Sequence, residues 1–281
     1  MILFMDFGGY VSYNCCMERI GVGLITCDRE NFFIKCFESV HKLKHKFDFL
    51  VVVNDGDAID TDSIDNFDCI DVYHHNEQNQ GVGVSKNIAI EHILQASCDH
   101  VFLIEDDVVL HDPEVFNRYI NMSKISGIKH LNFCLHGNDN KIDGSPAPKL
   151  IIDYKHDKLA LYHNLYGALS YYHKDVIDDI GLMDTAYQNA MEHVDHTMLA
   201  CQSKFHPPFR WFADIAGSDQ LIHEQDQGHE QSKIRSRQQW LEDFAFGVKR
   251  FYDKFDVNVC DPTQKTADKQ QVVEFLKEIK P

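Results

Sequence analysis

The sequence predicts an α/β fold built on a mixed, mostly parallel sheet that helices flank. Three continuous apolar runs stand in its first part: IGVGLI at 20–25, FLVVV at 49–53 and HVFLI at 100–104. Unbroken apolar runs of this kind are typical of parallel strands that are covered on both faces. Helical patterns at 30–43 and 84–96 lie between the runs, and this alternation indicates βαβ units.

The second part of the chain is richer in loops. Asp112-Pro113-Glu114 has the form of a helix start, with Asp as the N-cap and Pro at the first helical position. Short β-like runs follow between 129 and 175, and a loop rich in Gly, Asn, Asp and Pro interrupts them at 136–149.

Helical segments are predicted next, around 186–201 and at 238–255. The sequence contains neither an internal repeat nor a clear linker. We therefore expect one domain over residues 1–281, with a helical C-terminal tail at 238–281.

The composition excludes several classes of protein. Of the 281 residues, 44% are hydrophobic and 25% charged, as in ordinary globular proteins, and the net charge of −17 disfavours nucleic acids and anionic membranes as partners. No apolar run reaches the roughly 20 residues that span a bilayer, and the N-terminus does not have the form of a signal peptide. The nine Cys lack C-x-x-C pairs, which argues against a zinc knuckle and favours the cytoplasm.

Three consecutive carboxylates, Glu105, Asp106 and Asp107, follow the third predicted strand. In parallel α/β sheets ligands bind beyond the carboxyl ends of the strands, and adjacent carboxylates there repel each other unless a cation lies between them. Mg²⁺ or Mn²⁺, shared with phosphate oxygens, is the natural partner. A solvated loop after the strand is the alternative.

A second candidate is a phosphate site at the start of the helical pattern 84–96. Gly81 and Gly83 free the backbone before the helix and Lys86 lies in its first turn, which favours a diphosphate at the helix N-terminus. The spacing matches neither the Walker loop nor the dinucleotide fingerprint. Asp55 follows the second strand, although Asn-Asp-Gly-Asp is also an ordinary turn composition.

Two later clusters could carry acid–base chemistry or bind metal. Glu192, His193, Asp195 and His196 lie close together on a predicted helix and could supply a general base, although a polar helix face is the alternative. Farther on, the polar segment 223–237 contains further candidates.

In that segment His223 and His229 are candidate metal ligands. Lys233, Arg235 and Arg237 form the densest basic group of this acidic chain, and a loop that carries them could close over a phosphate. A plain solvated segment is the alternative.

Taken in order, these motifs resemble those of the family 2-like, inverting nucleotide-sugar glycosyltransferases of the GT-A fold. The matching segments are IGVGLITCDRE, VVVNDGDA, the series Asn79, Gly81, Lys86 and Asn87, the triplet Glu105-Asp106-Asp107, and a turn from Gly181 to Asp184 followed by Glu192-His193-Val194-Asp195. The resemblance covers roughly residues 19–235. It implies a nucleotide-sugar-binding half at 19–110 and an acceptor and catalytic half at 111–237.

The resemblance also implies roles for single residues. Thr26, Asp28 and Asp55 would border the base of the nucleotide, which is expected to be UDP. Asp106 would contact the ribose or the sugar, and Lys86 the base or the diphosphate. The whole predicted nucleotide-sugar-binding set, to which the basic loop contributes the last two residues, is Thr26, Asp28, Asp55, Asn79, Gly81, Lys86, Glu105, Asp106, Lys233 and Arg235. The implied metal set, for Mn²⁺ or Mg²⁺, is Asp107 with His223 or His229.

Two departures from the family pattern affect the triplet and the base. The triplet begins with Glu105, and the usual Glu-Asp pair reads Glu192-His193. The base is therefore Glu192, which we favour narrowly, or His193, which is suited to neutral pH, or Asp195. Loss of catalysis is a further alternative.

The resemblance thus implies a hexosyltransferase-type enzyme that moves a sugar from a nucleotide-sugar to a glycan or another hydroxyl acceptor. One alternative is a sugar-nucleotide pyrophosphorylase, but TCDREN lacks the Gly-rich, Arg-containing loop expected after the first strand. Another is a non-catalytic GT-A protein that binds a carbohydrate or a nucleotide.

Overall fold

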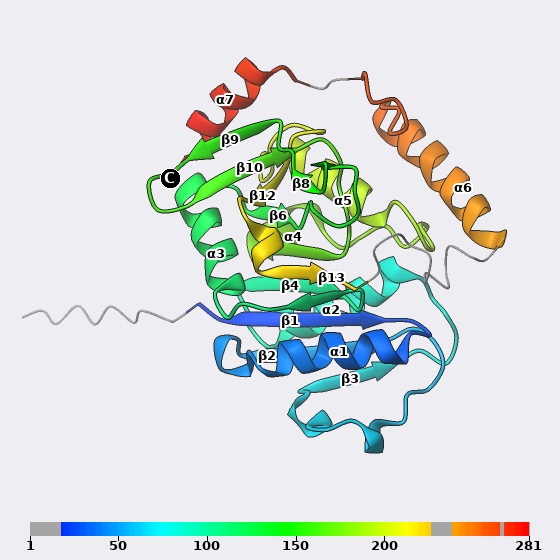
Figure 1. The fold of residues 1–281 in the computed structure, drawn as a ribbon. Helices are drawn as coiled ribbons and strands as arrows, with labels where there is room; N and C mark the ends of the chain where they lie inside the picture. The colour runs from blue at the N-terminus through cyan, green and yellow to red at the C-terminus, as the bar shows by residue number, and fades with distance from the viewer. Residues whose placement is uncertain (1–17, 226–237, 265–266, 281) are drawn as a thin grey trace, which may run out of the picture.

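The central sheet of the computed structural model, which describes residues 18–225, 238–264 and 267–280, is the predicted one (Figure 1). Its strands run in the order β3 (Val72–His75), β2 (Phe49–Asn54), β1 (Ile20–Thr26), β4 (His100–Glu105), β11 (Leu169–His173) and β6 (His130–Asn132). The first four are parallel, whereas β11 runs antiparallel to both of its neighbours. The predicted mixed, mostly parallel sheet is confirmed.

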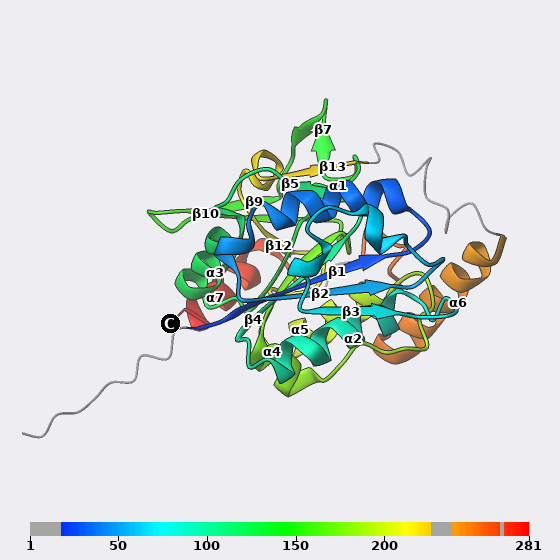
Figure 2. The same ribbon diagram turned by 90° about the horizontal axis from the view of Figure 1, so that it is seen from below.

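Helices cover both faces of this sheet (Figure 2). One face carries α1 (Glu30–His41) and α3 (Val115–Ser126). The other carries α2 (Val82–Gln95) and α4 (Lys174–Ile180), with α5 (Glu192–Gln202) beside them.

The burial of β4 explains why its sequence is a continuous apolar run. Phe102 and Ile104 pack in the hydrophobic cluster on the α1 face, and Val101 and Leu103 pack in the cluster on the α2 face. Successive side chains of a strand point to opposite faces, so both sets must be apolar when both faces are covered.

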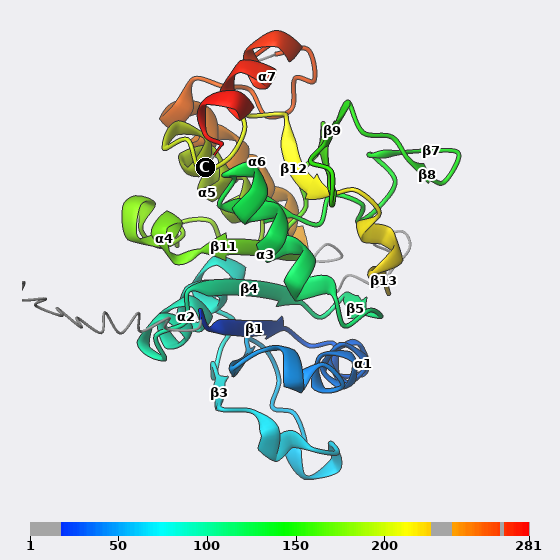
Figure 3. The same ribbon diagram turned by 90° about the vertical axis from the view of Figure 1, so that its left-hand side faces the viewer.

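A smaller sheet and several short elements form the rest of the chain (Figure 3). The smaller sheet contains β9 (Leu150–Asp153), β10 (Lys158–Tyr162) and β12 (Phe212–Ile215). Two antiparallel pairs join β5 (Val108–Leu110) to β13 (Ile222–Glu224) and β7 (Lys141–Ile142) to β8 (Ser145–Pro146). The 3₁₀ turns are Lys44–Lys46, Thr61–Ser63, Phe67–Cys69 and Ser218–Gln220.

Two helices close the chain. α6 (Gln238–Phe255) coincides with its predicted range, and α7 (Lys269–Glu278) lies in the tail 238–281 that was predicted to be helical, although its bounds were not predicted. The start of α7 is fixed by a capping box, in which the Asp268 side chain accepts from the Gln271 backbone N–H and the Gln271 side chain accepts from the Asp268 backbone N–H. None of the helices in the described ranges is long and apolar enough to cross a membrane.

Two predicted helix starts are wrong. Asp112 accepts a hydrogen bond from the Glu114 backbone in a turn, and α3 begins only at Val115. The segment predicted around 186–201 becomes helical only at Glu192, because Met191 adopts a left-handed backbone with φ of 77° that ends the helix on its N-terminal side. The division of the chain into halves at residue 110 stays a prediction, although the sheet itself crosses it.

The close packing of β1 on α2 gives a test of this fold. A Cβ at Gly23 would lie 2.7 Å from the Ala89 Cβ, which cannot rotate away. We expect Gly23→Ala to lower the free energy of unfolding by about 1–3 kcal/mol through overpacking. Urea unfolding of Gly23→Ala, Ala89→Gly and the double variant measures this. The double variant should lose less than the sum of the single losses, and strict additivity would contradict the contact.

Candidate functional site

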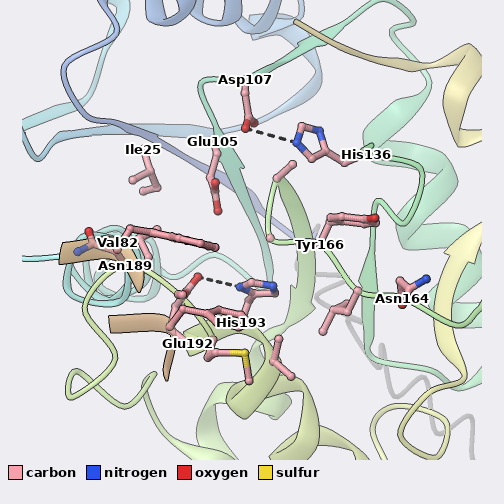
Figure 4. Close-up of a pocket in the computed structure, with 18 of the residues that line it drawn as sticks. Ile25, Val82, Glu105, Asp107, His136, Asn164, Tyr166, Asn189, Glu192 and His193 are labelled. Atoms are coloured by element: carbon pink, nitrogen blue, oxygen red, sulfur yellow. Dashed lines mark hydrogen bonds and ion pairs between the residues drawn. The ribbon is translucent and has the colours of Figure 1, made fainter. Parts of the chain in front are cut away.

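A cavity of about 450 Å³ lies beyond the carboxyl ends of β1 and β4. Figure 4 shows two pairs of side chains on its opposite walls: Asp107 with His136, and Glu192 with His193, with Glu105 extending between them. Loops, the end of β1, the start of α2 and of β12, and helices α5 and α6 supply the remaining lining. The cavity therefore lies where an open α/β sheet binds its ligands.

Asp106 is buried in the wall of the cavity, in contact with β1 and the loop after it. The Thr26 hydroxyl donates to Asp106 Oδ2 at 2.6 Å, and the Arg29 guanidinium donates to Asp106 Oδ1. Burial raises the pKa of Asp106 to about 7, against the opposing charge of Arg29. Since its oxygens are taken up by these partners, Asp106 orients the triplet, and its contact with a ribose or a sugar stays a prediction.

Asp107 carries the feature that best fits a cation. Its Oδ1 is buried and accepts no hydrogen bond from the part of the chain that the structure describes. Its Oδ2 lies 3.8 Å from the Arg29 guanidinium and 3.6 Å from His136 Nε2. A buried carboxylate oxygen without a donor is costly unless a ligand completes it, and a divalent cation is such a ligand.

The residues near Asp107 provide few further ligands. His136 Nδ1 lies 3.6 Å from Glu224, but Glu224 is already bonded to Lys141 and to the Gly137 backbone. Within the described ranges no three His, Cys, Asp or Glu side chains converge well enough to hold a metal ion. A metal here would take Asp107 and His136 and complete its shell with phosphate oxygens and water, as Mg²⁺ commonly does.

A buried lysine joins the two walls of the cavity. Lys86 Nζ donates to Glu105 Oε1 at 2.7 Å and to Glu192 Oε1 at 3.0 Å, and both Lys86 and Glu192 are almost fully buried. Burial would raise the pKa of Glu192, but the charges of Lys86 and His193 hold it well below its usual range. Glu192 is therefore a fixed anion at neutral pH.

His193 stands beside this anion and lines the cavity. Its Nδ1 lies 3.1 Å from Glu192 Oε1, and its side chain keeps 19% of its surface exposed. The Gly167 backbone lies against the same group, because a Cβ there would be 3.1 Å from His193 Nδ1. The ring is thus held at one nitrogen by a carboxylate, with the loop at Gly167 confining it.

Asp195, the third candidate base, is not brought to the cavity. Its carboxylate is fully buried, accepts from the Tyr187 hydroxyl at 2.9 Å and pairs with Lys254 at 2.7 Å. It does not line the cavity. Asp195 follows Glu192 by three residues in α5, but its carboxylate is occupied by Tyr187 and by Lys254 of α6, and it therefore anchors α6.

The other residues expected to bind the nucleotide lie at the end of β1, directly after β2 and in the loop before α2. Thr26, Asp55 and Asn79 line the cavity. Asp55 accepts from the backbone N–H groups of Gln80 and Gly81 at 2.8 and 2.9 Å, so it positions that loop, and its contact with a base stays a prediction.

Two further expectations, for Asp28 and Gly81, concern loops. Asp28 lines a neighbouring cavity and accepts from the Asp57 backbone at 2.8 Å. Gly81 has φ of 96°, and a Cβ there would lie 2.4 Å from the Gln188 carbonyl oxygen. It therefore lets the start of α2 pack closely against the loop that leads to α5.

The candidates from the segment 223–237 have different outcomes. His223 is exposed, its ring is tilted by 37° against that of His111 with ring centroids 4.0 Å apart, and it does not line the cavity that Asp107 lines. His229, Lys233 and Arg235 lie outside the described residues.

The sequence reasoning missed Arg29 and His136. Arg29 stands in the segment that carried the resemblance, and its charge was a usable signal. His136 follows β6 at the start of a loop, and only the antiparallel strand order brings it to Asp107.

Solved structures share this architecture. S. aureus TarS (residues 1–349) superposes with a TM-score of 0.55 at 16% identity, over 93% of this chain and 70% of that one. A second TarS structure gives 0.55 at 15% identity, over 93% and 42%. The mannosyltransferase PcManGT from Pyrobaculum calidifontis, in complex with GDP-Man and Mn²⁺, gives 0.50 at 13% identity, over 82% and 64%.

The chain has a GT-A fold. The fold class predicted from the motifs is thereby confirmed. Neither a protein-family model nor a curated protein matches the sequence. At these identities the likeness concerns the fold, and the chemistry of the site depends on the side chains of this chain.

Lys86 gives a test of the site's electrostatics. In Lys86→Met two carboxylates lose their buried cation, and we expect a loss of about 3–5 kcal/mol in the free energy of unfolding at pH 7. The native protein loses stability as the pH falls below the ordinary Glu pKa of about 4.3, since the pKa of Glu192 is lowered by folding. In Lys86→Met, protonation removes the uncompensated charge of the two carboxylates. The difference in the free energy of unfolding between the variant and the native protein should therefore shrink as the pH falls.

Urea unfolding at pH 7 and pH 4 measures this difference. Adding Glu192→Gln to Lys86→Met should recover part of the loss at pH 7, because one of the unpaired charges is removed. An equal deficit at both pH values, without recovery in the double variant, would contradict the charge network.

Proposed function

We propose that this protein is a metal-dependent, inverting glycosyltransferase that moves a sugar from a nucleotide-sugar to an acceptor hydroxyl. One observation carries the proposal: Asp107, whose buried Oδ1 has no hydrogen-bond donor among the described residues, lies across the same cavity from the Glu192–His193 pair. A diphosphate leaving group needs positive charge, and an acceptor hydroxyl needs a base. The GT-A neighbours, one with GDP-Man and Mn²⁺, support this class of reaction.

On the donor side we propose a UDP-sugar, as the motif resemblance implies. Asp107 and His136 would hold Mn²⁺ or Mg²⁺, which when bound supplies charge stabilisation to the leaving diphosphate. Arg29, with its guanidinium between Asp106 and Asp107, keeps the triplet oriented and offsets its negative charge.

For the base we propose His193, in place of Glu192. Glu192 is almost fully buried, and its lowered pKa makes it a poor proton acceptor near neutral pH. With Nδ1–H donating to Glu192, the other ring nitrogen of His193 carries the lone pair. Glu192 then acts as a positioning residue that fixes the tautomer and stabilises the imidazolium.

In the reaction, the acceptor oxygen forms a bond to the anomeric carbon as its proton passes to His193 Nε2. The bond from the anomeric carbon to the phosphate oxygen breaks, and the nucleoside diphosphate leaves with the electron pair. Attack from the face opposite the leaving group inverts the anomeric configuration.

A cytoplasmic site of action is part of the proposal, since no disulfide joins the cysteines of the described ranges.

The Asp107 carboxylate gives the first test. Asp107→Ala should abolish Mn²⁺-dependent release of UDP from UDP-sugars, a loss of about 10²-fold or more, since it removes the residue that would hold the cation. The control is Asp253→Ala on α6, whose side chain is 56% exposed. A coupled assay for UDP, with Mn²⁺ and with EDTA, measures the rates.

Thermal shift completes this test. UDP with Mn²⁺ should stabilise the native protein more than either alone, and should not do so in Asp107→Ala. Tight UDP binding without any release from UDP-sugars would favour the non-catalytic alternative. No stabilisation by any nucleoside diphosphate would refute the proposal.

The base assignment gives the second test. His193→Gln should lower kcat by about 10²–10⁴-fold with little change in the KM for the donor, since the lost contribution is proton transfer. Glu192→Gln should lower kcat less and alter its pH profile. His45→Gln, at an exposed histidine, is the control. If Glu192→Gln lowers kcat more than His193→Gln does, and His193→Gln leaves the pH profile of kcat unchanged, Glu192 itself is the base.

A further inference from the structure

The cavity continues past His193 along helix α6. The lining on this side includes side chains of the loop before β11, the loop before α5, the segment before β12, and α6. In Figure 4 the His193 ring lies between Asn189 at one end of the cavity and Asn164 with Tyr166 at the other. None of these groups is needed for the donor chemistry proposed above.

Two buried polar atoms in this part of the cavity are left without partners in the described chain. Asn189 Oδ1 and Arg210 Nε are both buried and make no hydrogen bond there, although both residues line the cavity. The orientation of the Asn189 amide is fixed, because its Nδ2 donates to Asp243 at 2.6 Å. Asn189 thus offers a hydrogen-bond acceptor at one end of this part of the cavity, and Arg210 offers a hydrogen-bond donor at the other.

The Arg210 guanidinium is only partly available to a ligand. Its Nη2 donates to the carbonyl oxygens of Val259 and Asp261, each at 2.7 Å, and its Nη1 lies 3.4 Å from His163 Nε2. A phosphate is bound best by two parallel donors of one arginine, and here Nη2 is already occupied. A single neutral oxygen, such as a hydroxyl, fits the remaining Nε–H better.

The wall between the two ends is aromatic. The rings of Trp240 and Phe244 are stacked one turn apart on α6, with centroids 5.3 Å apart and an interplanar angle of 19°. Both line the cavity, as do Phe209 and Phe212. The electron-rich face of such rings attracts the polarised C–H groups of a pyranose.

The separation of the two ends follows from α6. Asn189 is bonded to Asp243, and Phe209, next to Arg210, packs on Phe251 with ring centroids 5.5 Å apart. Eight helical residues separate Asp243 from Phe251, which corresponds to about 12 Å. A groove that runs between two points this far apart along α6 is longer than one pyranose ring, which favours a ligand of more than one sugar unit.

We propose that this α6 groove, defined by Asn189, Arg210, Trp240 and Phe244, binds the acceptor and that the acceptor is a carbohydrate chain of at least two sugar units. Its hydroxyls would satisfy Asn189 and Arg210, and one ring would stack on Trp240 while another hydroxyl faces His193. A hydrocarbon chain would leave both polar atoms buried without partners, at about 1–3 kcal/mol each. The identification of this chain as an acceptor rests on the proposed function.

Binding can be measured without donor or metal, so its outcome is separate from that of the transferase proposal. The chain has two tryptophans, and in a Trp211→Phe background Trp240 is the only one. The probes are gluco-, manno- and N-acetylglucosamine oligosaccharides of one to six units, farnesyl phosphate, and a Ser/Thr-rich peptide. We expect a saturable change in Trp240 emission with at least one oligosaccharide series, and an affinity that rises about tenfold from one unit to three.

Calorimetry on variants of the native background assigns the contacts. Trp240→Ala and Asn189→Ala should each weaken oligosaccharide binding about tenfold. The matched controls are Leu241→Ala, whose side chain is 64% exposed on the outer face of α6, and Gln188→Ala, next to Asn189 in the chain. These should bind within about twofold of the native protein, and melting temperatures verify that all four variants fold.

The results of these experiments distinguish a failure of the groove proposal from a failure of the transferase proposal. No response to any oligosaccharide, an affinity independent of chain length, or a response to farnesyl phosphate or the peptide in place of sugars overturns the inference and leaves the transferase proposal standing. Oligosaccharide binding at Trp240 without Mn²⁺-dependent UDP release supports a glycan groove and refutes the transferase.

Discussion

The ion pairs of Lys86 with Glu105 and Glu192 are the interaction on which the arrangement of this cavity depends. Lys86 comes from α2, Glu105 from the end of β4 and Glu192 from the start of α5. A buried ammonium needs its carboxylate partners, and they need the ammonium, because a charge that is buried without an opposite charge is strongly destabilising. The network therefore fixes three separate elements at one point, and it does so beside the triplet and beside His193.

This arrangement keeps two kinds of chemistry apart within one cavity. Asp107 and His136 present a place for positive charge on one wall, whereas His193 is held by an anion on the other (Figure 4). The positive charge of Lys86 is neutralised by the carboxylates of Glu105 and Glu192. An additional cation at Asp107 is thus compatible with the local charge balance, and the lowered pKa of Glu192 is the reason why we propose the neighbouring imidazole as the base.

α6 gives the cavity its third wall, and its attachment uses charges that sequence reasoning had assigned to catalysis. Lys254 pairs with Asp195, and Arg250 donates to Asp184, the last residue of the Gly-x-x-Asp turn. The two acidic residues of α5 therefore have different contacts: Glu192 lines the cavity, and Asp195 holds helix α6, which also lines it. Residues three positions apart on a helix share a face, so the motif by itself does not tell which of the two contacts the cavity and which contacts α6.

The sequence by itself determined the α/β class, the order of the first strands and helices, and the position of the triplet at the end of β4. Those features follow from local periodicity and from apolar runs, and they need no knowledge of distant contacts. The tertiary structure alone decided which polar side chains meet: His136 with Asp107, Glu192 with Lys86, and Asp195 with Lys254. These pairs join residues far apart in the chain through an antiparallel strand order and a left-handed residue before α5, and both depend on packing across the whole sheet.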